Sequence, residues 1–216
     1  MAAAVFILLA YLVGSLSFAV IVSRAFGLPD PHTYGSGNPG ATNVLRTGRK
    51  LAALLTLVGD AGKGWLAVYL AERYAADYGV DATGIAACAV AVFLGHLFPV
   101  FFGFRGGKGV STAGGILLAV QPWLGLATLA TWIVIAVFFR YASLASLVAA
   151  VFAPLYAFFM SLLGFDLGVM LPAVILMAVL LVWRHKSNIL NLGAGRERRI
   201  GEKQDSGSRI QDPGKP

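Results

Sequence analysis

Three stretches of the sequence combine glycine with basic and amide side chains, which is the chemistry of an anion site. Residues 34–46 read YGSGNPGATNVLR, residues 95–112 read GHLFPVFFGFRGGKGVST, and residues 184–189 read RHKSNI. Glycine lets backbone N–H groups approach a phosphate, lysine supplies a mobile point charge, and arginine offers a planar fork to phosphate oxygens. The three stretches together therefore predict a site for a phosphate-bearing ligand.

Each stretch taken alone also has a simpler interpretation. The G-G-K-G run at 106–109 fits a flexible basic loop, and it is not a Walker A motif because Gly109 follows Lys108. The N-P-G run at 38–40 is a favourable turn. His96 suits a packed, hydrogen-bonded histidine, and His185 suits a basic residue at a membrane interface. A functional interpretation requires that the fold bring the three stretches to one side of the protein.

The composition indicates what kind of fold must do this. Hydrophobic residues make up 58% of the 216 residues and charged residues 12%, with a mean hydropathy of +0.77; soluble domains carry roughly a quarter charged residues. A disordered chain is excluded by the same numbers. Apolar runs long enough to cross a bilayer predict an all-α polytopic membrane protein. They span residues 2–22, 51–71, 82–102, 113–139, 142–163 and 167–183.

The basic residues predict how these runs are oriented. Residues 23–50, residues 103–112 and the segment after Trp183 are rich in lysine and arginine, whereas residues 72–81 hold three acids and Arg73. The positive-inside rule then places the first three segments in the cytoplasm and residues 72–81 outside. The N-terminus is predicted to be outside and the C-terminus inside. Arg24 follows the first run instead of preceding it, so that run is predicted to be a retained helix and not a signal peptide.

The number of crossings depends on the run at 113–139. Twenty-seven residues form a helix of about 40 Å, which is long for one crossing, and Gln121-Pro122 interrupts it. A break there gives about seven transmembrane helices and satisfies the predicted loop locations. The alternative is five crossings, with one run that does not traverse the membrane. Residues 1–192 are predicted to form one membrane domain, and residues 193–216 a cytoplasmic, disordered tail.

Asp60 and Lys63 are charged residues within an apolar run, three positions apart and so on one helix face. Charges in a spanning segment are costly and normally face the bundle interior. Two interpretations remain open. The pair neutralises itself and allows the neighbouring glycines to pack, or Lys63 lies close to a bound phosphate.

Other chemistries are not supported by the sequence. It contains no H-E-x-x-H or G-x-S-x-G motif, and neither His96 nor His185 is followed four residues later by aspartate. A single cysteine, Cys88, lies within a run and excludes a disulfide framework inside the chain. No metal, cofactor or nucleic acid is expected. The rivals from other classes are a transporter for small anions or phosphate esters and a head-group transferase, although the latter lacks a carboxylate cluster for magnesium.

The three stretches resemble the three cytoplasmic motifs of the PlsY family, bacterial membrane acyl-phosphate:glycerol-3-phosphate acyltransferases. The shared residues include S-G-N-P-G-A-T-N at 36–43 with Arg46, G-H at 95–96, and G-G-K-G-V at 106–110 with Thr112. They also include Arg184-His185, Asn188-Ile189, Gly195 and Glu197, together with D-x-x-K-G at 60–64. The resemblance covers about residues 5 to 197. One departure is Asn191, where the family pattern has arginine.

The resemblance implies a seven-helix fold in the bacterial inner membrane with its site at the cytoplasmic face. It implies transfer of an acyl group from a long-chain acyl phosphate to the sn-1 hydroxyl of glycerol 3-phosphate. The products are lysophosphatidic acid and phosphate, which is the first step of phospholipid synthesis. The expected partners are these two substrates, the lipid bilayer, and the enzyme that supplies acyl phosphate.

The residues fit this chemistry. An acyl phosphate is already activated, so catalysis requires alignment and charge stabilisation more than a nucleophile. Lys108 and Arg46 are expected to hold phosphate, Ser36 to hydrogen-bond phosphate or the oxyanion, and His96 to organise the site or act as a base. The expected substrate-binding residues are Asn38, Gly40, Thr42, Asn43, Lys63, Gly106, Gly107, Gly109, Thr112, His185 and Asn188.

Overall fold

The computed structural model describes residues 1–202, and these contain helices without any β-strand. The chain begins with α1 (Ala2–Gly14), α2 (Phe18–Ala25), a short α3 (Ala41–Leu45) and the long α4 (Lys50–Tyr74), which continues into the 3₁₀ turn η1 (Ala75–Tyr78). It continues through α5 (Ala82–Leu97), η2 (Val100–Phe102), α6 (Val110–Val120) and α7 (Pro122–Phe139). It closes with α8 (Ala142–Leu162), α9 (Leu171–Arg184) and α10 (Lys186–Gly193).

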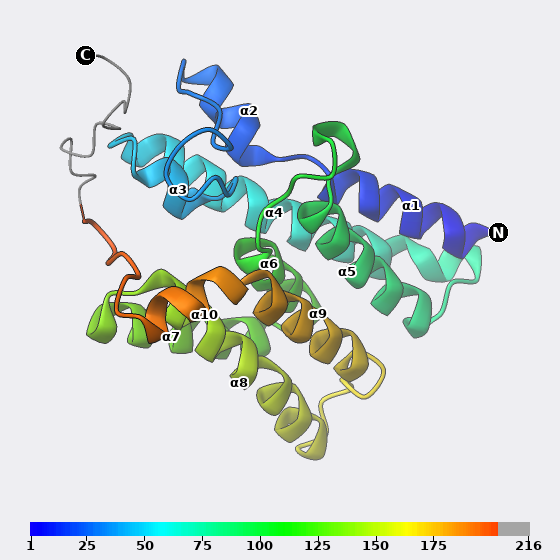
Figure 1. Ribbon diagram of the computed structural model, residues 1–216. Helices are drawn as coiled ribbons and strands as arrows, with labels where there is room; N and C mark the ends of the chain where they lie inside the picture. The colour runs from blue at the N-terminus through cyan, green and yellow to red at the C-terminus, as the bar shows by residue number, and fades with distance from the viewer. Residues whose placement is uncertain (203–216) are drawn as a thin grey trace, which may run out of the picture.

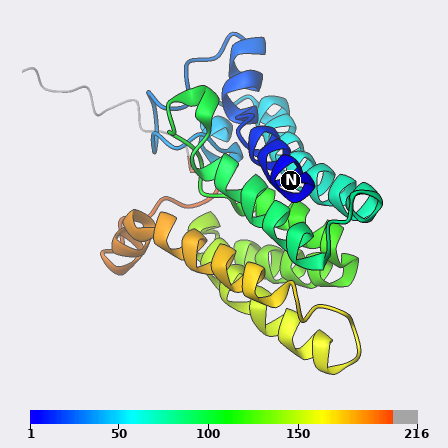
Figure 2. The ribbon, with the colours of Figure 1, turned by 90° about the vertical axis from the view of Figure 1, so that its right-hand side faces the viewer.

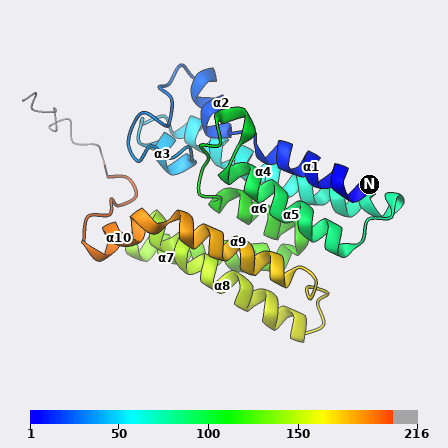
Figure 3. The same cartoon turned by 45° about the vertical axis from the view of Figure 1, so that its right-hand side comes forward.

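The helices form two adjoining groups (Figure 1, Figure 3). Helix α1 packs on α5 and α4, and α6 packs on α4, whereas α7, α8 and α9 follow one another in a second group that meets the first through α6–α7 and α5–α9 contacts. Figure 2 shows the same division from the side of the N-terminus. The polar stretches lie at the ends of these helices, so the packing of the two groups decides how they meet.

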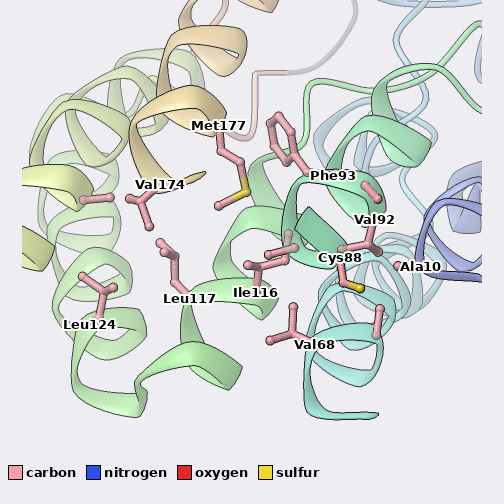
Figure 4. Close-up of a cluster of buried hydrophobic side chains, with 14 of the residues drawn as sticks. Ala10, Val68, Cys88, Val92, Phe93, Ile116, Leu117, Leu124, Val174 and Met177 are labelled. Atoms are coloured by element: carbon pink, nitrogen blue, oxygen red, sulfur yellow. The ribbon is translucent and has the colours of Figure 1, made fainter. Parts of the chain in front are cut away.

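In the core, small residues pack around a few large side chains. Figure 4 shows Phe93, Ile116 and Met177 from α5, α6 and α9, which belong to one cluster of buried side chains. Glycines bring backbones together: a Cβ at Gly115 would lie 1.9 Å from the carbonyl oxygen of Ala61, and one at Gly14 would lie 2.1 Å from that of Val92. Lipid tails give helices no hydrophobic reason to associate, so close backbone packing of this kind holds a membrane bundle together.

The hydropathy prediction of spanning helices agrees with the structure in most places. Within residues 1–202, four helices are long and apolar enough to cross a membrane alone, and six spans result when the bent pairs α1–α2 and α9–α10 each count as one. The predicted break in the run at 113–139 is confirmed, since α6 ends at Val120 and α7 begins at Pro122. Helix α6 has 11 residues, about 16 Å, so it is the span on which a count of seven depends. That count and the orientation stay predictions.

The first run differs from its prediction. Residues 2–22 were expected to form one retained helix, but α1 ends at Gly14 and α2 starts at Phe18, with a bend of 41° between them. The hydroxyl of Ser15 donates to the carbonyl of Tyr11 at 2.9 Å. The ammonium of Lys63 donates to the carbonyl of Leu16 at 2.6 Å. This distant lysine satisfies a carbonyl that the break leaves without a helical partner.

Candidate active site

The polar stretches meet at the end of the bundle away from the N-terminus. Figure 3 shows α3, α10 and the loop between α5 and α6 at or near this end, while the N-terminus and the α4–α5 turn lie at the other. Residues far apart in the sequence are linked there. Arg184 hydrogen-bonds to the carbonyls of Gly106 and Gly107, and Lys108 hydrogen-bonds to Asn188. The fold therefore brings the second and third stretches into direct contact.

The first stretch is organised around Asn43, which is buried. Its carboxamide donates to the carbonyls of Pro31 at 2.9 Å and Tyr34 at 3.2 Å, and its oxygen accepts the N–H of Ser36 at 3.0 Å. Arg46 donates to the same oxygen at 3.4 Å. The amide hydrogens of Asn43 are thus used inside the loop. Asn43 thus shapes the loop and contacts Arg46, and its direct contact with substrate stays a prediction.

The second stretch is a glycine loop held from two sides. The N–H of Gly107 donates to the carbonyl of His96 at 3.1 Å, and Arg184 donates to the carbonyls of Gly106 at 2.7 Å and Gly107 at 3.2 Å. A Cβ at Gly106 would lie 2.1 Å from the carbonyl oxygen of His96, and one at Gly107 would lie 2.2 Å from its Nε2 atom. Only glycine fits at these two positions. Gly109 has φ +87 and caps the start of α6.

Lys108 lies at the start of a chain of side-chain hydrogen bonds between the second and third stretches. Its ammonium donates to the side-chain oxygen of Asn188. The amide nitrogen of Asn188 in turn donates to the carboxylate of Glu197 at 2.7 Å. This arrangement fixes the orientation of the Asn188 amide, because the amide oxygen must face the lysine and the amide nitrogen the carboxylate.

The cations at this end of the protein shift one another's pKa values. Burial lowers the pKa of Lys108 to about 8, with Glu197 acting to raise it and the charges of Arg46 and Arg184 acting to lower it further. Burial also lowers the pKa of Arg46, where Arg198 adds to the effect and Glu197 opposes it. These cations thus lie close enough to repel one another. A phosphate dianion among them would relieve that repulsion and raise the pKa of Lys108.

His185 and Thr112 are both buried. Nδ1 of His185 donates to the carbonyl of Leu181 at 2.8 Å, which leaves Nε2 as the free ring nitrogen of the neutral form. Thr112 is fully buried on α6 against α4, where a Cβ at Gly64 would lie 2.4 Å from its carbonyl oxygen. The structure thus places Thr112 in the helix contact below the loop.

The remaining expected residues divide into two sets. Ser36, Asn38, Gly40 and Thr42 lie on the exposed or half-exposed side of the first loop. Lys63 and His96 lie deeper: Lys63 pairs with Asp60 at 2.9 Å, and His96 Nδ1 lies 3.5 Å from the same carboxylate. This geometry favours the self-neutralising interpretation of Lys63 over direct contact with a phosphate.

Sequence reasoning left three contributors outside the expected site. Arg184 binds the glycine loop and Glu197 orients Asn188; both belong to the quoted motifs, so their types were visible but their contacts were not. His32 joins the loops, since Nδ1 lies 2.6 Å from Asp30 and Nε2 lies 2.9 Å from the carbonyl of Arg105. Nothing in the spacing of His32 signals this link. No cluster of three or more potential metal ligands occurs within residues 1–202.

Comparison with known proteins decides the family. The profile of the glycerol-3-phosphate acyltransferase family matches residues 4–195. The glycerol-3-phosphate acyltransferases of Ralstonia pickettii (strain 12J) and Burkholderia multivorans (strain ATCC 17616 / 249) are 66% and 61% identical to the chain. These alignments cover 94% and 96% of this chain and 96% of each relative. The chain belongs to the glycerol-3-phosphate acyltransferase family.

The fold is also that of a solved family member. The crystal structure of PlsY (YgiH), an integral membrane glycerol 3-phosphate acyltransferase in its glycerol 3-phosphate form, is 37% identical in sequence and superposes with a TM-score of 0.84. The match covers 93% of this chain and 96% of that one. A second structure of PlsY, in its lysophosphatidic acid form, gives a TM-score of 0.83. This chain is accordingly an all-α integral membrane protein, as its composition predicted.

Proposed function

We propose that this member of the family uses a long-chain acyl phosphate as donor and acylates the sn-1 hydroxyl of glycerol 3-phosphate directly. The observation that carries the proposal is the half-buried Lys108 in a glycine loop, hydrogen-bonded to Asn188 and close to Arg46 and Arg184. Both substrates bring phosphate to this cluster, and the acyl donor adds an apolar tail that the bilayer accommodates. The PlsY forms with glycerol 3-phosphate and with lysophosphatidic acid support the acceptor and the product.

The reaction needs no protein nucleophile. The glycerol hydroxyl oxygen attacks the acyl carbonyl carbon, the bond from that carbon to the phosphate oxygen breaks, and phosphate leaves with the electron pair. A phosphate oxygen of a substrate accepts the hydroxyl proton, so atoms and charge balance. Lys108 and Arg46 hold phosphate and offset the charge that develops, which is where electrostatic catalysis acts. His96 lies below the loop and organises it.

The other proposed substrate contacts follow from where each residue lies relative to Lys108. Nε2 of His185 and the amide of Asn188 orient glycerol 3-phosphate beside Lys108. Ser36, Asn38, Gly40 and Thr42 offer hydrogen bonds from the exposed loop, next to the N–H groups of the glycine loop. The site faces the cytoplasm of a bacterial inner membrane, where glycerol 3-phosphate is in solution and an enzyme that makes acyl phosphate can deliver the donor.

The test uses the purified protein with palmitoyl phosphate and labelled glycerol 3-phosphate, followed by product analysis. We expect 1-acyl-glycerol 3-phosphate and inorganic phosphate in equal amounts, with orthophosphate as an inhibitor. Acyl-CoA is the control donor, and it should react poorly because its thioester lacks the phosphate that Lys108 and Arg46 are proposed to hold. Turnover of acyl-CoA that matches that of acyl phosphate would contradict the proposed donor.

A further inference from the structure

A group of buried charges lies beneath the glycine loop, deeper than the cations that are proposed to hold phosphate. The side chains of Asp60 and Lys63 are each 2% exposed and form an ion pair of 2.9 Å on α4. Isolated charges at this depth are costly, so each needs partners. Lys63 has a second partner in the carbonyl of Leu16, at 2.6 Å, where the chain breaks between α1 and α2. The pair thus ties α4 to the end of the first helix.

Asp60 also faces the last turn of α5. Its Oδ1 atom lies 3.5 Å from Nδ1 of His96, and within residues 1–202 this ring nitrogen has no hydrogen bond at normal distance. The opposite edge of the ring faces the glycine loop, because a Cβ at Gly107 would lie 2.2 Å from Nε2. The imidazole of His96 therefore fills the space between the Asp60 carboxylate and Gly107.

The backbone of His96 reinforces the same contact. Its carbonyl accepts the N–H of Gly107 at 3.1 Å. From the other side Arg184 donates to the carbonyls of Gly106 and Gly107. The two residues that precede Lys108 are thus held between His96 and Arg184.

Helix α4 also fixes the segment that follows Lys108. Helix α6 begins two residues after it and packs on α4 with little space: a Cβ at Gly64 would lie 2.4 Å from the carbonyl oxygen of Thr112, and one at Gly115 would lie 1.9 Å from that of Ala61. Figure 1 shows α4, α5 and α6 side by side, as their contacts require. Asp60 lies on the helix that supports both ends of the loop.

We propose that Asp60 is a positioning residue for Lys108. It acts through His96, with its own charge balanced by Lys63, to hold the glycine loop in the shape that is proposed to bind phosphate. This inference rests on the proposed role of Lys108 as a phosphate-binding cation. Asp60 touches no substrate. A change of about 1 Å in the position of a binding group can cost on the order of a hundredfold in rate, so a support of this kind should be visible in kinetics.

The alternative is that the ion pair only stabilises helix packing. The two accounts differ in whether Asp60 is coupled to Lys108. A packing role lowers the amount of folded protein, and its effect is independent of which residue stands at 108. A positioning role disappears when Lys108 is absent, because there is then no ammonium to position.

A double-mutant cycle measures this coupling in protein purified in lipid nanodiscs. Asp60→Asn should lower kcat/KM for glycerol 3-phosphate by about tenfold or more in the wild-type background, yet by less than about twofold in the Lys108→Met background. An equal loss in both backgrounds would overturn the proposal. Glu72→Gln is the matched control, since Glu72 is an exposed carboxylate on the same helix, and it should behave as wild type.

A second variant covers the case in which Asp60→Asn fails to fold, because that change leaves the Lys63 cation without its carboxylate. Asp60→Asn/Lys63→Met removes both charges. We expect it to insert and accumulate while its KM for glycerol 3-phosphate stays several-fold above the wild-type value. Wild-type kinetics in this variant would show that the pair only neutralises itself, and would overturn the proposal.

Binding separates this inference from the proposed reaction. Glycerol 3-phosphate alone should raise the unfolding temperature of the wild-type protein, and it should do so much less for Asp60→Asn/Lys63→Met. This result would stand even if acyl phosphate proved not to be the donor. An undiminished shift in the double variant would count against Asp60 as a positioning residue, whatever the donor is.

Discussion

The protein contains two groups of charged residues that differ in how completely they are paired. In the deep group, Asp60 and Lys63 are each 2% exposed and bind each other, and Lys63 also binds a backbone carbonyl. In the outer group, Lys108, Arg46 and Arg184 lie half-buried at the end of the bundle. The carboxylate of Glu197, on the C-terminal segment, acts to raise the pKa of both Lys108 and Arg46.

The difference explains why one group is proposed to bind a ligand while the other holds the fold. The two charges of a buried pair attract each other and leave little attraction for a ligand, and removing one of them leaves the other uncompensated. The outer cations repel one another, so their attraction remains available to an incoming anion. In this protein the deep pair supports the loop that carries Lys108, and the two groups are therefore coupled.

A reversed membrane topology would contradict this comparison most strongly, because it would place the outer cations on the opposite side of the membrane. Arg49 and Asp77 are exposed and lie beyond opposite ends of α4, a helix about 37 Å long. In a Cys88→Ala background, Arg49→Cys should react with an impermeant thiol reagent from the cytoplasmic side and Asp77→Cys from the outside. Labelling of both from the same side would contradict the proposed location of the site.

Loss of an outer cation should have the next largest effect. Lys108→Ala and Arg46→Ala should each lower turnover by roughly a hundredfold, about 3 kcal/mol, because each removes a half-buried cation that is proposed to offset the charge of the transition state. Lys108→Arg should fail as well, since a planar guanidinium does not replace a point charge between Gly107 and Gly109. Lys215→Ala is the charge-matched control and should be silent. Near-normal rates in the Lys108 variants would remove this residue from the site.

The pH dependence tests the electrostatics of the outer group. The pKa of Lys108 is about 8 in the free protein, so the ammonium is charged below pH 8 and neutral above it. The value of kcat/KM for glycerol 3-phosphate should fall about tenfold per pH unit above that point. The alkaline decrease should be absent in Lys108→Met. A wild-type profile that stays flat to pH 10 would show that the charge of Lys108 does not matter.

The smallest effect is expected at the C-terminus. Glu197 binds Asn188, and the N–H of Ile200 donates to the carbonyl of Arg140 at 2.6 Å. We therefore expect truncation after Arg198 to leave activity within a few-fold, and truncation after Glu202 to change it less. Residues 203–216, part of the tail predicted to be disordered, lie outside the described residues. Complete loss of activity in a truncated protein that still inserts would reveal a functional element in the tail.

Much of the fold was predictable because it depends on local patterns. The apolar runs predicted the spanning helices, and Gln121-Pro122 predicted the break between α6 and α7. The break at residues 15–17 was not predictable, since that run contains no proline or charge. Lys63, whose ammonium donates to the carbonyl of Leu16 at this break, lies 47 residues further along the chain.

The candidate site was predictable as a set of residue types but not as a set of contacts. Glycine, lysine and arginine in the three stretches indicated an anion site. The sequence could not show that Asn43 uses its amide hydrogens on Pro31 and Tyr34, because those bonds depend on the shape of the loop. The role of Arg184 depends on two carbonyls about 78 residues away, which no local pattern encodes.

Direct transfer between two phosphate-bearing substrates is the central claim, and initial-rate kinetics test it most directly. Acyl phosphate and glycerol 3-phosphate are varied together over a grid of concentrations, and the protein is analysed by mass spectrometry during turnover. Direct transfer predicts intersecting lines in double-reciprocal plots, no acyl burst and no acylated residue, because both substrates must be bound at once. Parallel lines together with a trapped acyl-enzyme that turns over at the reaction rate would contradict it.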